Sequence, residues 1–200
     1  PAVAEWRDGH GKALAIIQST TAIVSVTSSS ILIWMILRSR ARLSITYHRL
    51  VLGMSIADIL LSLSFAQFNA MAPSDTSYVE WNTRGSQATC SAQGFVMTVG
   101  MGSGLLYICS VNLYYLAIVK YNKPDRYIRT KIEPFLHGVP IVFALIFSIT
   151  MLVNQNLNDN MGGICIMPVY DPLHCIGYED GQVREGFKIP CGRGRDGAVT

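Results

Sequence analysis

The chain contains four long apolar segments, and these limit what it can fold into more than any other feature. They are residues 13–37, 50–72, 94–119 and 135–153, and Asp58 is the only Asp, Glu, Lys or Arg within them. The first segment would give about 37 Å of α-helix, which exceeds the roughly 30 Å hydrocarbon core of a bilayer. Only 14% of all residues are charged, against about 25% in soluble domains. We therefore expect an all-α membrane protein, a helical transmembrane bundle.

The charges of the connections predict the orientation of this bundle. Basic residues predominate between the first and second segments and again between the third and fourth. The positive-inside rule places these two connections in the cytoplasm. The N-terminus is then extracellular, as is the polar stretch 154–200. We expect residues 1–200 to form a single multi-pass transmembrane domain, with the plasma membrane as its location.

The sequence lacks the motifs of the common enzyme classes. It contains no phosphate-binding loop, metal-ligand cluster or nucleophile elbow, and its four histidines are scattered over different segments. The basic residues form no continuous face of the kind that binds nucleic acid. We expect no enzymatic activity, no organic cofactor and no nucleic-acid partner.

Four cysteines fall on the predicted outer side, where disulfides persist. They are Cys90, Cys165, Cys175 and Cys191. Four cysteines allow three sets of pairs, and the residues alone do not select one. Zinc binding is the alternative, but the spacing matches no common zinc-site pattern. We predict disulfide bonds.

Asp58 is the most unusual residue of the apolar segments. Helical rise puts it about 12 Å from the inner edge of its span, and a charge at such depth costs about 2.5–3.5 kcal/mol on insertion scales. We expect it to face the bundle interior and to have a hydrogen-bonding partner, a bound ion or a proton. Candidate neighbours are Ser29 or Ser30 of the first segment and Ser103 of the third. The alternative is a protonated Asp58 in a structural network.

Several motifs resemble those of the seven-helix G-protein-coupled receptors. The stretch Ser55-Ile-Ala-Asp-Ile-Leu is similar to the second-helix motif of rhodopsin-like receptors. Cys90 stands where that family keeps a cysteine bonded to the second outer loop. Residues 113–121 are similar to the third-helix exit, but Tyr114, or Tyr115 when counted from Cys90, replaces its arginine. The chain looks more like divergent protist receptors, rhodopsin-like or cyclic-AMP-receptor-like.

The resemblance implies that the chain holds the first four of seven helices. It implies a receptor that senses an extracellular ligand, signals through a heterotrimeric G protein and holds a sodium ion near Asp58. Ligand contacts would be Gln93, Met97, Met101 and residues 164–168, with plain packing as the alternative for both methionines. The G-protein-facing residues would be Arg38, Arg40, Arg42, Tyr114, Tyr115, Lys120, Arg126, Arg129 and Lys131. The positive-inside rule alone is the alternative explanation for the basic residues among them.

The same resemblance implies a disulfide from Cys90 to the loop after the fourth segment. We expect Cys175 as its partner in preference to Cys165, with the remaining two cysteines joined to each other. Two other classes stay open. A transporter or channel would need a polar path, yet only Asp58 is charged within the spans. A tetraspanin-like scaffold would keep both termini inside, against the predicted orientation.

Overall fold

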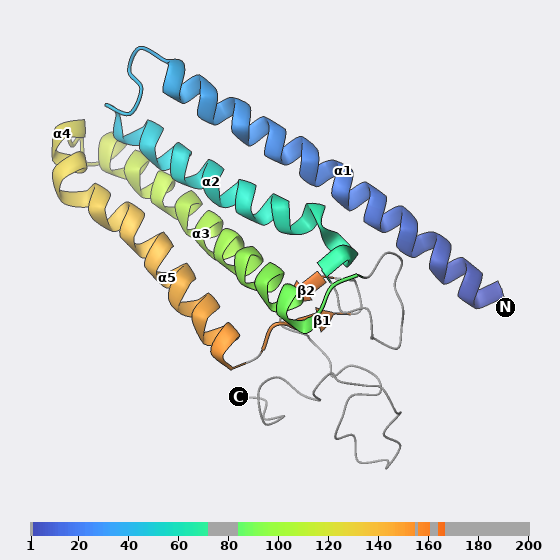
Figure 1. The fold of residues 1–200 in the computed structure, drawn as a ribbon. Helices are drawn as coiled ribbons and strands as arrows, with labels where there is room; N and C mark the ends of the chain where they lie inside the picture. Colours follow the sequence, from blue (N-terminus) through green and yellow to red (C-terminus); the bar gives the residue numbers. More distant parts are fainter. Residues whose placement is uncertain (1, 72–83, 155, 161–163, 167–200) are drawn as a thin grey trace. The chain divides into compact units, whose positions relative to one another are not determined.

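The computed structural model describes residues 2–71, 84–154, 156–160 and 164–166, which are mostly helical (Figure 1). Four helical stretches are long and apolar enough to cross a membrane, as the sequence predicts: Lys12–Arg38, Thr46–Ala66, Gln87–Val119 and Asp125–Val153. The elements are α1 (Ala2–Arg38), α2 (Thr46–Ala66), the 3-10 helix η1 (Phe68–Met71), α3 (Gln87–Val119), α4 (Asp125–Tyr127), the π-helix η2 (Ile128–Ile132), α5 (Glu133–Val153), β1 (Asn158–Asn160) and β2 (Ile164–Ile166).

These elements contribute to two compact units. One contains Ile23–Leu63 and Thr98–Phe147, and we call it the Asp58 unit. The other contains Pro1–Ala22, Ser64–Met97 and Ser148–Thr200, and we call it the disulfide unit.

The helices begin earlier than the apolar segments predict, and at α3 a capping contact explains the earlier start. α3 begins at Gln87 rather than Gly94. Just before it, the Ser86 N–H donates to Thr89 Oγ1 at 2.7 Å, and the Thr89 N–H donates to Ser86 Oγ at 3.4 Å. This reciprocal pair is a capping box, in which two otherwise unsatisfied donors find acceptors.

The other predicted boundaries also differ from the ends of the helices. α1 begins at Ala2 rather than Ala13 and ends at Arg38, because helical hydrogen bonding continues into the polar residues before the apolar stretch. Helical structure before α5 begins at Asp125, where the N–H groups of Tyr127 and Ile128 both donate to the Pro124 carbonyl. α2 begins at Thr46 and ends at Ala66, several residues before the expected position 72.

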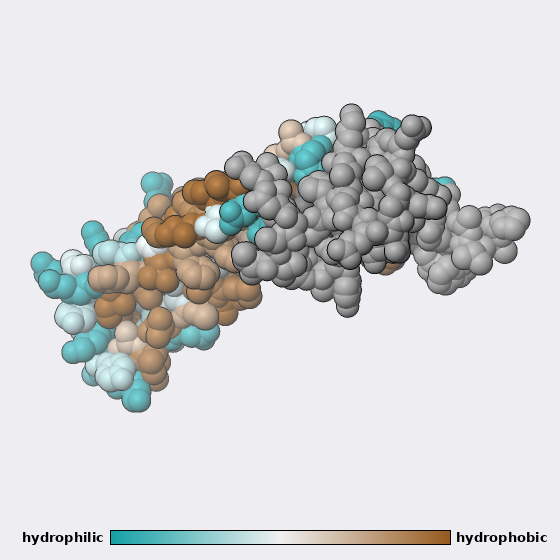
Figure 2. Space-filling view, turned by 90° about the horizontal axis from the view of Figure 1, so that it is seen from below, coloured by the Kyte–Doolittle hydropathy of each residue, from teal (hydrophilic) through white to brown (hydrophobic). Residues whose placement is uncertain are grey.

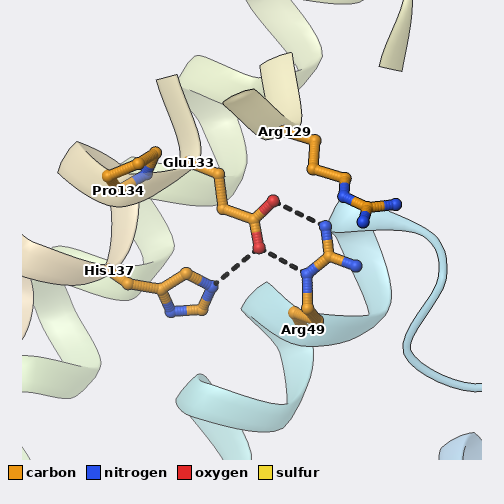
Figure 3. A pocket seen from close by; sticks show the side chains of 5 residues that line it. All are labelled: Arg49, Arg129, Glu133, Pro134 and His137. Carbon is orange, nitrogen blue, oxygen red and sulfur yellow. Dashed lines mark hydrogen bonds and ion pairs between the residues drawn. The ribbon is translucent and has the colours of Figure 1, made fainter. Parts of the chain in front are cut away.

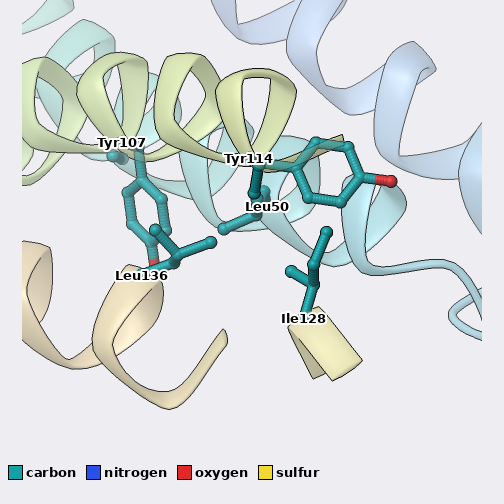
Figure 4. Close-up of a cluster of buried hydrophobic side chains, with 7 residues drawn as sticks. Leu50, Tyr107, Tyr114, Ile128 and Leu136 are labelled. Carbon is teal, nitrogen blue, oxygen red and sulfur yellow. The ribbon is translucent and has the colours of Figure 1, made fainter. Parts of the chain in front are cut away.

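An aromatic and aliphatic cluster forms the core of the Asp58 unit (Figure 4). Its buried members come from α2, α3, η2 and α5: Leu50, Ala57, Tyr107, Tyr114, Ala117, Ile128 and Leu136. Small residues allow the helices of this unit to approach closely. A Cβ added to Gly100 would lie 2.7 Å from the Leu61 nitrogen and 2.9 Å from the Ala57 oxygen. Gly100 therefore lets α3 touch the α2 backbone, the contact that glycine-rich membrane helices commonly make.

Large apolar side chains remain exposed along these helices. Val24 of α1 is 65% exposed, Val119 of α3 is 79% exposed and Phe135 of α5 is 69% exposed. Figure 2 shows hydrophobic side chains gathered over the coloured part of the visible face, with polar side chains at its left end. Within the described residues, the protein itself does not cover this apolar surface.

In the disulfide unit, a short hairpin packs against the first turns of α3. β1 and β2 pair antiparallel, with Asp159 opposite Cys165. A Cβ added to Gly94 would lie 2.6 Å from the Cys165 carbonyl oxygen, so a glycine is needed for this approach. The Gln87 side chain also donates to the Leu157 carbonyl at 3.2 Å. The stretch that was expected to be a loop therefore contains two strands close to α3.

Candidate functional site

Two carboxylates of the Asp58 unit are held by polar partners from other helices. The first is Asp58 itself, half-buried on α2. Its Oδ2 accepts hydrogen bonds from the Ser25 hydroxyl at 2.8 Å and from the Ser29 hydroxyl at 2.6 Å, both on α1. Residues four apart lie on the same face of a helix, so the two hydroxyls converge on one oxygen atom. Asp58 Oδ2 is thus bound by two neutral donors.

The neighbours of Asp58 were only partly predicted. Ser29 was expected and is a partner. Ser103 is not, because its hydroxyl donates to the Val99 carbonyl at 2.6 Å and the Gly100 carbonyl at 3.3 Å, within its own helix. Serines in helices commonly bond back in this way. The second partner is Ser25, and its spacing of four from Ser29 was the sequence signal that could have identified it.

The second carboxylate is Glu133, at the start of α5. Arg49 of α2 binds it in a bidentate ion pair: its Nε donates to Oε1, and its Nη2 donates to Oε2 at 2.5 Å. The buried Thr46 hydroxyl also donates to Oε2, at 3.2 Å. The side chains of Arg49 and Glu133 are only 21% and 12% exposed. Bidentate arginine–carboxylate pairs are among the strongest and most specific polar contacts in proteins.

His137 extends this network toward α3. Its Nε2 lies 3.7 Å from Glu133 Oε1, and its Nδ1 lies 3.0 Å from the Tyr107 hydroxyl. The Tyr107 ring packs edge-on to the imidazole, with centroids 5.6 Å apart. A continuous polar chain therefore joins Arg49, Glu133, His137 and Tyr107 across α2, α5 and α3.

A cleft of about 440 Å³ opens beside this network (Figure 3). Its lining residues are Arg49, Arg129, Glu133, Pro134 and His137. Arg129, Glu133 and His137 recur every four residues, and a π-turn bond from the Glu133 N–H to the Ile128 carbonyl precedes α5. The sequence predicted Arg129 as a G-protein-facing residue, Glu133 only as a charge of the connection, and His137 as one of four scattered histidines. Their regular spacing was the available signal, whereas nothing in the sequence indicated Arg49 as the partner.

The predicted outer-side residues have structural contacts in this part of the chain. Gln93 is buried, and its side-chain amide donates to the Ser64 carbonyl at 2.8 Å. Met97 is also buried, whereas Met101 is 37% exposed. Of residues 164–168, the structure describes only β2, since Met167 and Pro168 lie outside the described residues. Contact of any of these residues with a ligand stays a prediction.

The disulfide partner of Cys90 is Cys165, with Cα atoms 5.2 Å apart. The preference for Cys175 was therefore wrong. Packing of β2 against α3 brings Cys165 next to Cys90. The spacing of the cysteines in the sequence does not indicate this contact. Cys175 and Cys191 lie outside the described residues.

The predicted inner-side residues divide into exposed and buried sets. The exposed basic residues are Arg38, Arg40, Arg42, Lys120, Arg126, Arg129 and Lys131. Tyr115 is also exposed, at 46%. Tyr114 differs from the prediction: it is buried, stacks on Tyr47 with ring centroids 6.2 Å apart, and donates to Asp125 Oδ1 at 3.4 Å. A buried side chain cannot contact a partner directly, so Tyr114 is a packing residue here.

Comparison of this chain with known protein families, with curated protein sequences and with solved structures finds no match.

Proposed function

We propose that this chain is a multi-pass membrane protein of the receptor type, which senses an extracellular ligand and signals through a heterotrimeric G protein. The observation that carries the proposal is the Cys90–Cys165 disulfide, which joins the start of α3 to the segment after α5. The resemblance to seven-helix receptors implies a bond between these two places in the chain. A bond there holds the segment after α5 near the start of α3, which is the outer end of that helix in the proposed orientation and the side from which a ligand would approach.

The exposed apolar surface supports placement in a bilayer. Soluble proteins rarely leave large contiguous apolar patches uncovered, yet α5 alone exposes Phe135, Val139, Val142, Phe143, Ile146, Ile149 and Val153 by 49% or more each. The outward hydroxyls of α1 also suit lipid, because Thr20, Thr27 and Ser28 donate to carbonyls of their own helix. Polar groups satisfied in this way do not require water.

The Asp58 site supports the receptor reading and offers oxygen ligands for a sodium ion. Asp58 and the Ser25 and Ser29 hydroxyls supply three converging oxygens, and oxygen is the donor that hard cations prefer. Asp58 Oδ1 accepts no hydrogen bond from the described residues. These features fit a monovalent cation, which would neutralise the carboxylate. We propose that sodium binding at this site biases the receptor between two states, as a ligand with different affinities for each must do.

Epitope tags test the membrane placement. Tags at Ala2 and Asn158 should both bind antibody on intact cells, because the proposal places both sites outside. A tag at Arg40 should require permeabilised cells. Staining of Ala2 and Asn158 only after permeabilisation would reverse the proposed orientation, and loss of the protein from the membrane fraction would remove the proposal altogether.

Nucleotide exchange tests the signalling. The full-length protein in lipid nanodiscs should accelerate GDP release from at least one class of Gα subunit. Replacing Arg38, Arg40 and Arg42 by glutamine should lower that acceleration, since all three are exposed on the predicted inner side. The matched control is Arg84→Gln, an exposed arginine on the predicted outer side. If no Gα class responds, or if the control variant is equally impaired, coupling to a G protein is not the function.

A further inference from the structure

Arg49 and Glu133, which both line the cleft, form an ion pair in which each charge is balanced by the other. Glu133 Oε1 accepts from Arg49, and its Oε2 accepts from Arg49 and Thr46. Arg49 also donates to the Thr46 hydroxyl and, through Nη1, to the Leu43 carbonyl. These contacts use four of the five N–H groups of a guanidinium. The Glu133 carboxylate therefore attracts a further cation only weakly. Arg49 keeps one N–H that has no acceptor among the described residues.

Arg129 supplies the uncompensated charge of the cleft. Its side chain is exposed and, in the stretch of chain that the structure describes, forms no ion pair within 4.0 Å. Figure 3 shows its guanidinium on the Arg49 side of the cleft, away from His137. With Glu133 neutralised by Arg49, the remaining charge of the lining is positive.

We propose that this cleft binds a phosphate group, with Arg129 as the principal contact and the free Arg49 N–H as the second. Guanidinium groups match the geometry of phosphate oxygens and bind them with paired N–H donors. The phosphate would come from the headgroup of an anionic phospholipid or from free phosphate in solution. The lipid source rests on the proposed membrane placement, which puts the cleft at the inner leaflet, where basic pockets between helices hold anionic headgroups.

The volume of the cleft is sufficient for a compact anion such as phosphate. Its volume of about 440 Å³ lies at the lower end of small-molecule sites, which span roughly 300–1,000 Å³. Pro134 lines it as a rigid wall at the first turn of α5. The cationic side chains Arg126 and Lys131 flank Arg129 in sequence and are exposed, but neither lines the cleft. They provide controls of equal charge outside the site.

Lipid retention in nanodiscs tests the proposal. The full-length protein is reconstituted in phosphatidylcholine containing a small fraction of phosphatidylinositol bisphosphate, and native mass spectrometry counts the retained phosphoinositide. Arg129→Ala should lower retention about fivefold, the factor expected for one cationic contact near an anionic surface. Arg126→Ala, the matched control, should leave retention near the wild-type level. Arg129→Lys should restore part of the loss, because it returns the charge without the paired donors.

A second arm identifies the source of the phosphate. Inorganic phosphate is titrated into protein in pure phosphatidylcholine nanodiscs, and binding is followed by calorimetry. Saturable binding that Arg129→Ala abolishes supports the site with free phosphate as its ligand, whereas retention of the phosphoinositide alone supports the lipid. If Arg129→Ala and Arg126→Ala lose phosphoinositide equally, the binding reflects general surface charge, and the proposed phosphate site is wrong. If the protein does not enter nanodiscs at all, the proposed membrane placement is wrong, and this outcome is distinguishable from loss of the phosphate site alone.

Discussion

The Asp58 unit contains two carboxylates, one half-buried and one buried, whose partners are of opposite kinds. Asp58, in the middle of α2, accepts two hydrogen bonds from the neutral hydroxyls of Ser25 and Ser29. Glu133, at the first position of α5, is bound by the guanidinium of Arg49 and by Thr46. The ionised Asp58 site therefore has a net negative charge, whereas the charges of Glu133 and Arg49 cancel each other.

The difference follows from position along the helices. Arg49 lies nine positions before Asp58 on α2, about 13 Å by helical rise, near the end of the helix where basic residues are tolerated. On the proposed membrane placement, a cationic side chain would be costly in the middle of a span, so neutral hydroxyls are the side-chain partners that suit a carboxylate there. The Glu133 site is therefore suited to hold helices together, whereas the Asp58 site, bound only by hydroxyls among the described residues, is the one that we propose binds an ion.

The largest effect should come from breaking the ion pair. Arg49→Ala leaves Glu133 buried without its cation, which typically costs about 3–5 kcal/mol. We expect a pronounced fall in the thermal unfolding temperature of the purified protein in detergent, together with a reduced yield of folded protein.

A double variant separates the pair from the packing. Arg49→Met combined with Glu133→Gln removes both charges and keeps the volume, so it should recover most of the lost stability. Arg129→Ala, an exposed neighbour without an ion pair among the described residues, should change stability little. If the double variant is as unstable as Arg49→Ala, the loss reflects packing of the arginine stem and not a stranded carboxylate.

The Cys90–Cys165 disulfide allows the stability lost with a covalent bond to be compared with the loss expected for the ion pair. Cys90→Ser removes the Cys90–Cys165 bond, which spans a sequence separation of 75 residues, and should lower stability by about 2–4 kcal/mol. The measurement is the unfolding midpoint under non-reducing conditions. Reducing agent should lower the midpoint of the wild-type protein more than that of the variant, which has already lost this bond. Peptide mapping that finds a free thiol at Cys90 in folded protein would contradict this pairing.

Sequence reasoning identified the helices but not all of their ends. Hydropathy marks where an apolar helix fits a bilayer, and each predicted segment coincides with a helical stretch. It does not mark where helical hydrogen bonding begins, which local capping decides at Ser86 and Thr89. The hairpin after α5 was missed because strands of three residues have too few positions to show an alternating pattern.

The candidate sites were predicted to the extent that their contacts are local. The depth of Asp58 within its span follows from the position of one segment, and the depth of the serines follows from another. Ser29 could therefore be predicted as a neighbour of Asp58. The Arg49–Glu133 pair joins residues 84 positions apart, and such a contact depends on how α2 packs against α5. The choice of Cys165 over Cys175 likewise depends on the hairpin. Long-range pairing is not contained in the spacing of residues along a single chain.

Isosteric carboxamides compare the two sites directly. Glu133→Gln removes the charge that balances Arg49 and leaves a partly buried cation, whereas Asp58→Asn keeps an oxygen that can accept from Ser25 and Ser29. We expect Glu133→Gln to be the more destabilising variant by about 2 kcal/mol, the difference between a stranded charge and a retained hydrogen bond. Equal unfolding midpoints for the two variants would mean that the sites are energetically alike.

Sodium dependence distinguishes the sites in the opposite sense. Adding sodium should raise the unfolding midpoint of the wild-type protein, because a ligand that binds only the folded state stabilises it. Asp58→Asn should lose this response, and potassium or choline at equal ionic strength serves as the control. Arg49→Met with Glu133→Gln should retain it, since neither residue contributes to the Asp58 oxygens. A sodium response that survives Asp58→Asn would assign the ion elsewhere.

The smallest effect should come from the hydroxyls on α1. Ser25→Ala removes one donor to Asp58 Oδ2 and should cost about 1 kcal/mol, in the range measured for polar contacts between membrane helices. Ser28→Ala is the matched control, because the Ser28 hydroxyl donates to the Val24 carbonyl of its own helix at 2.9 Å. Alanine is the better helix former, so this control should be neutral or slightly stabilising. The comparison uses the difference between the two unfolding midpoints, which cancels the effect of helix propensity. If Ser28→Ala destabilises as much as Ser25→Ala, the hydroxyl at position 25 does no more for Asp58 than a surface serine, and the carboxylate must rely on Ser29 alone.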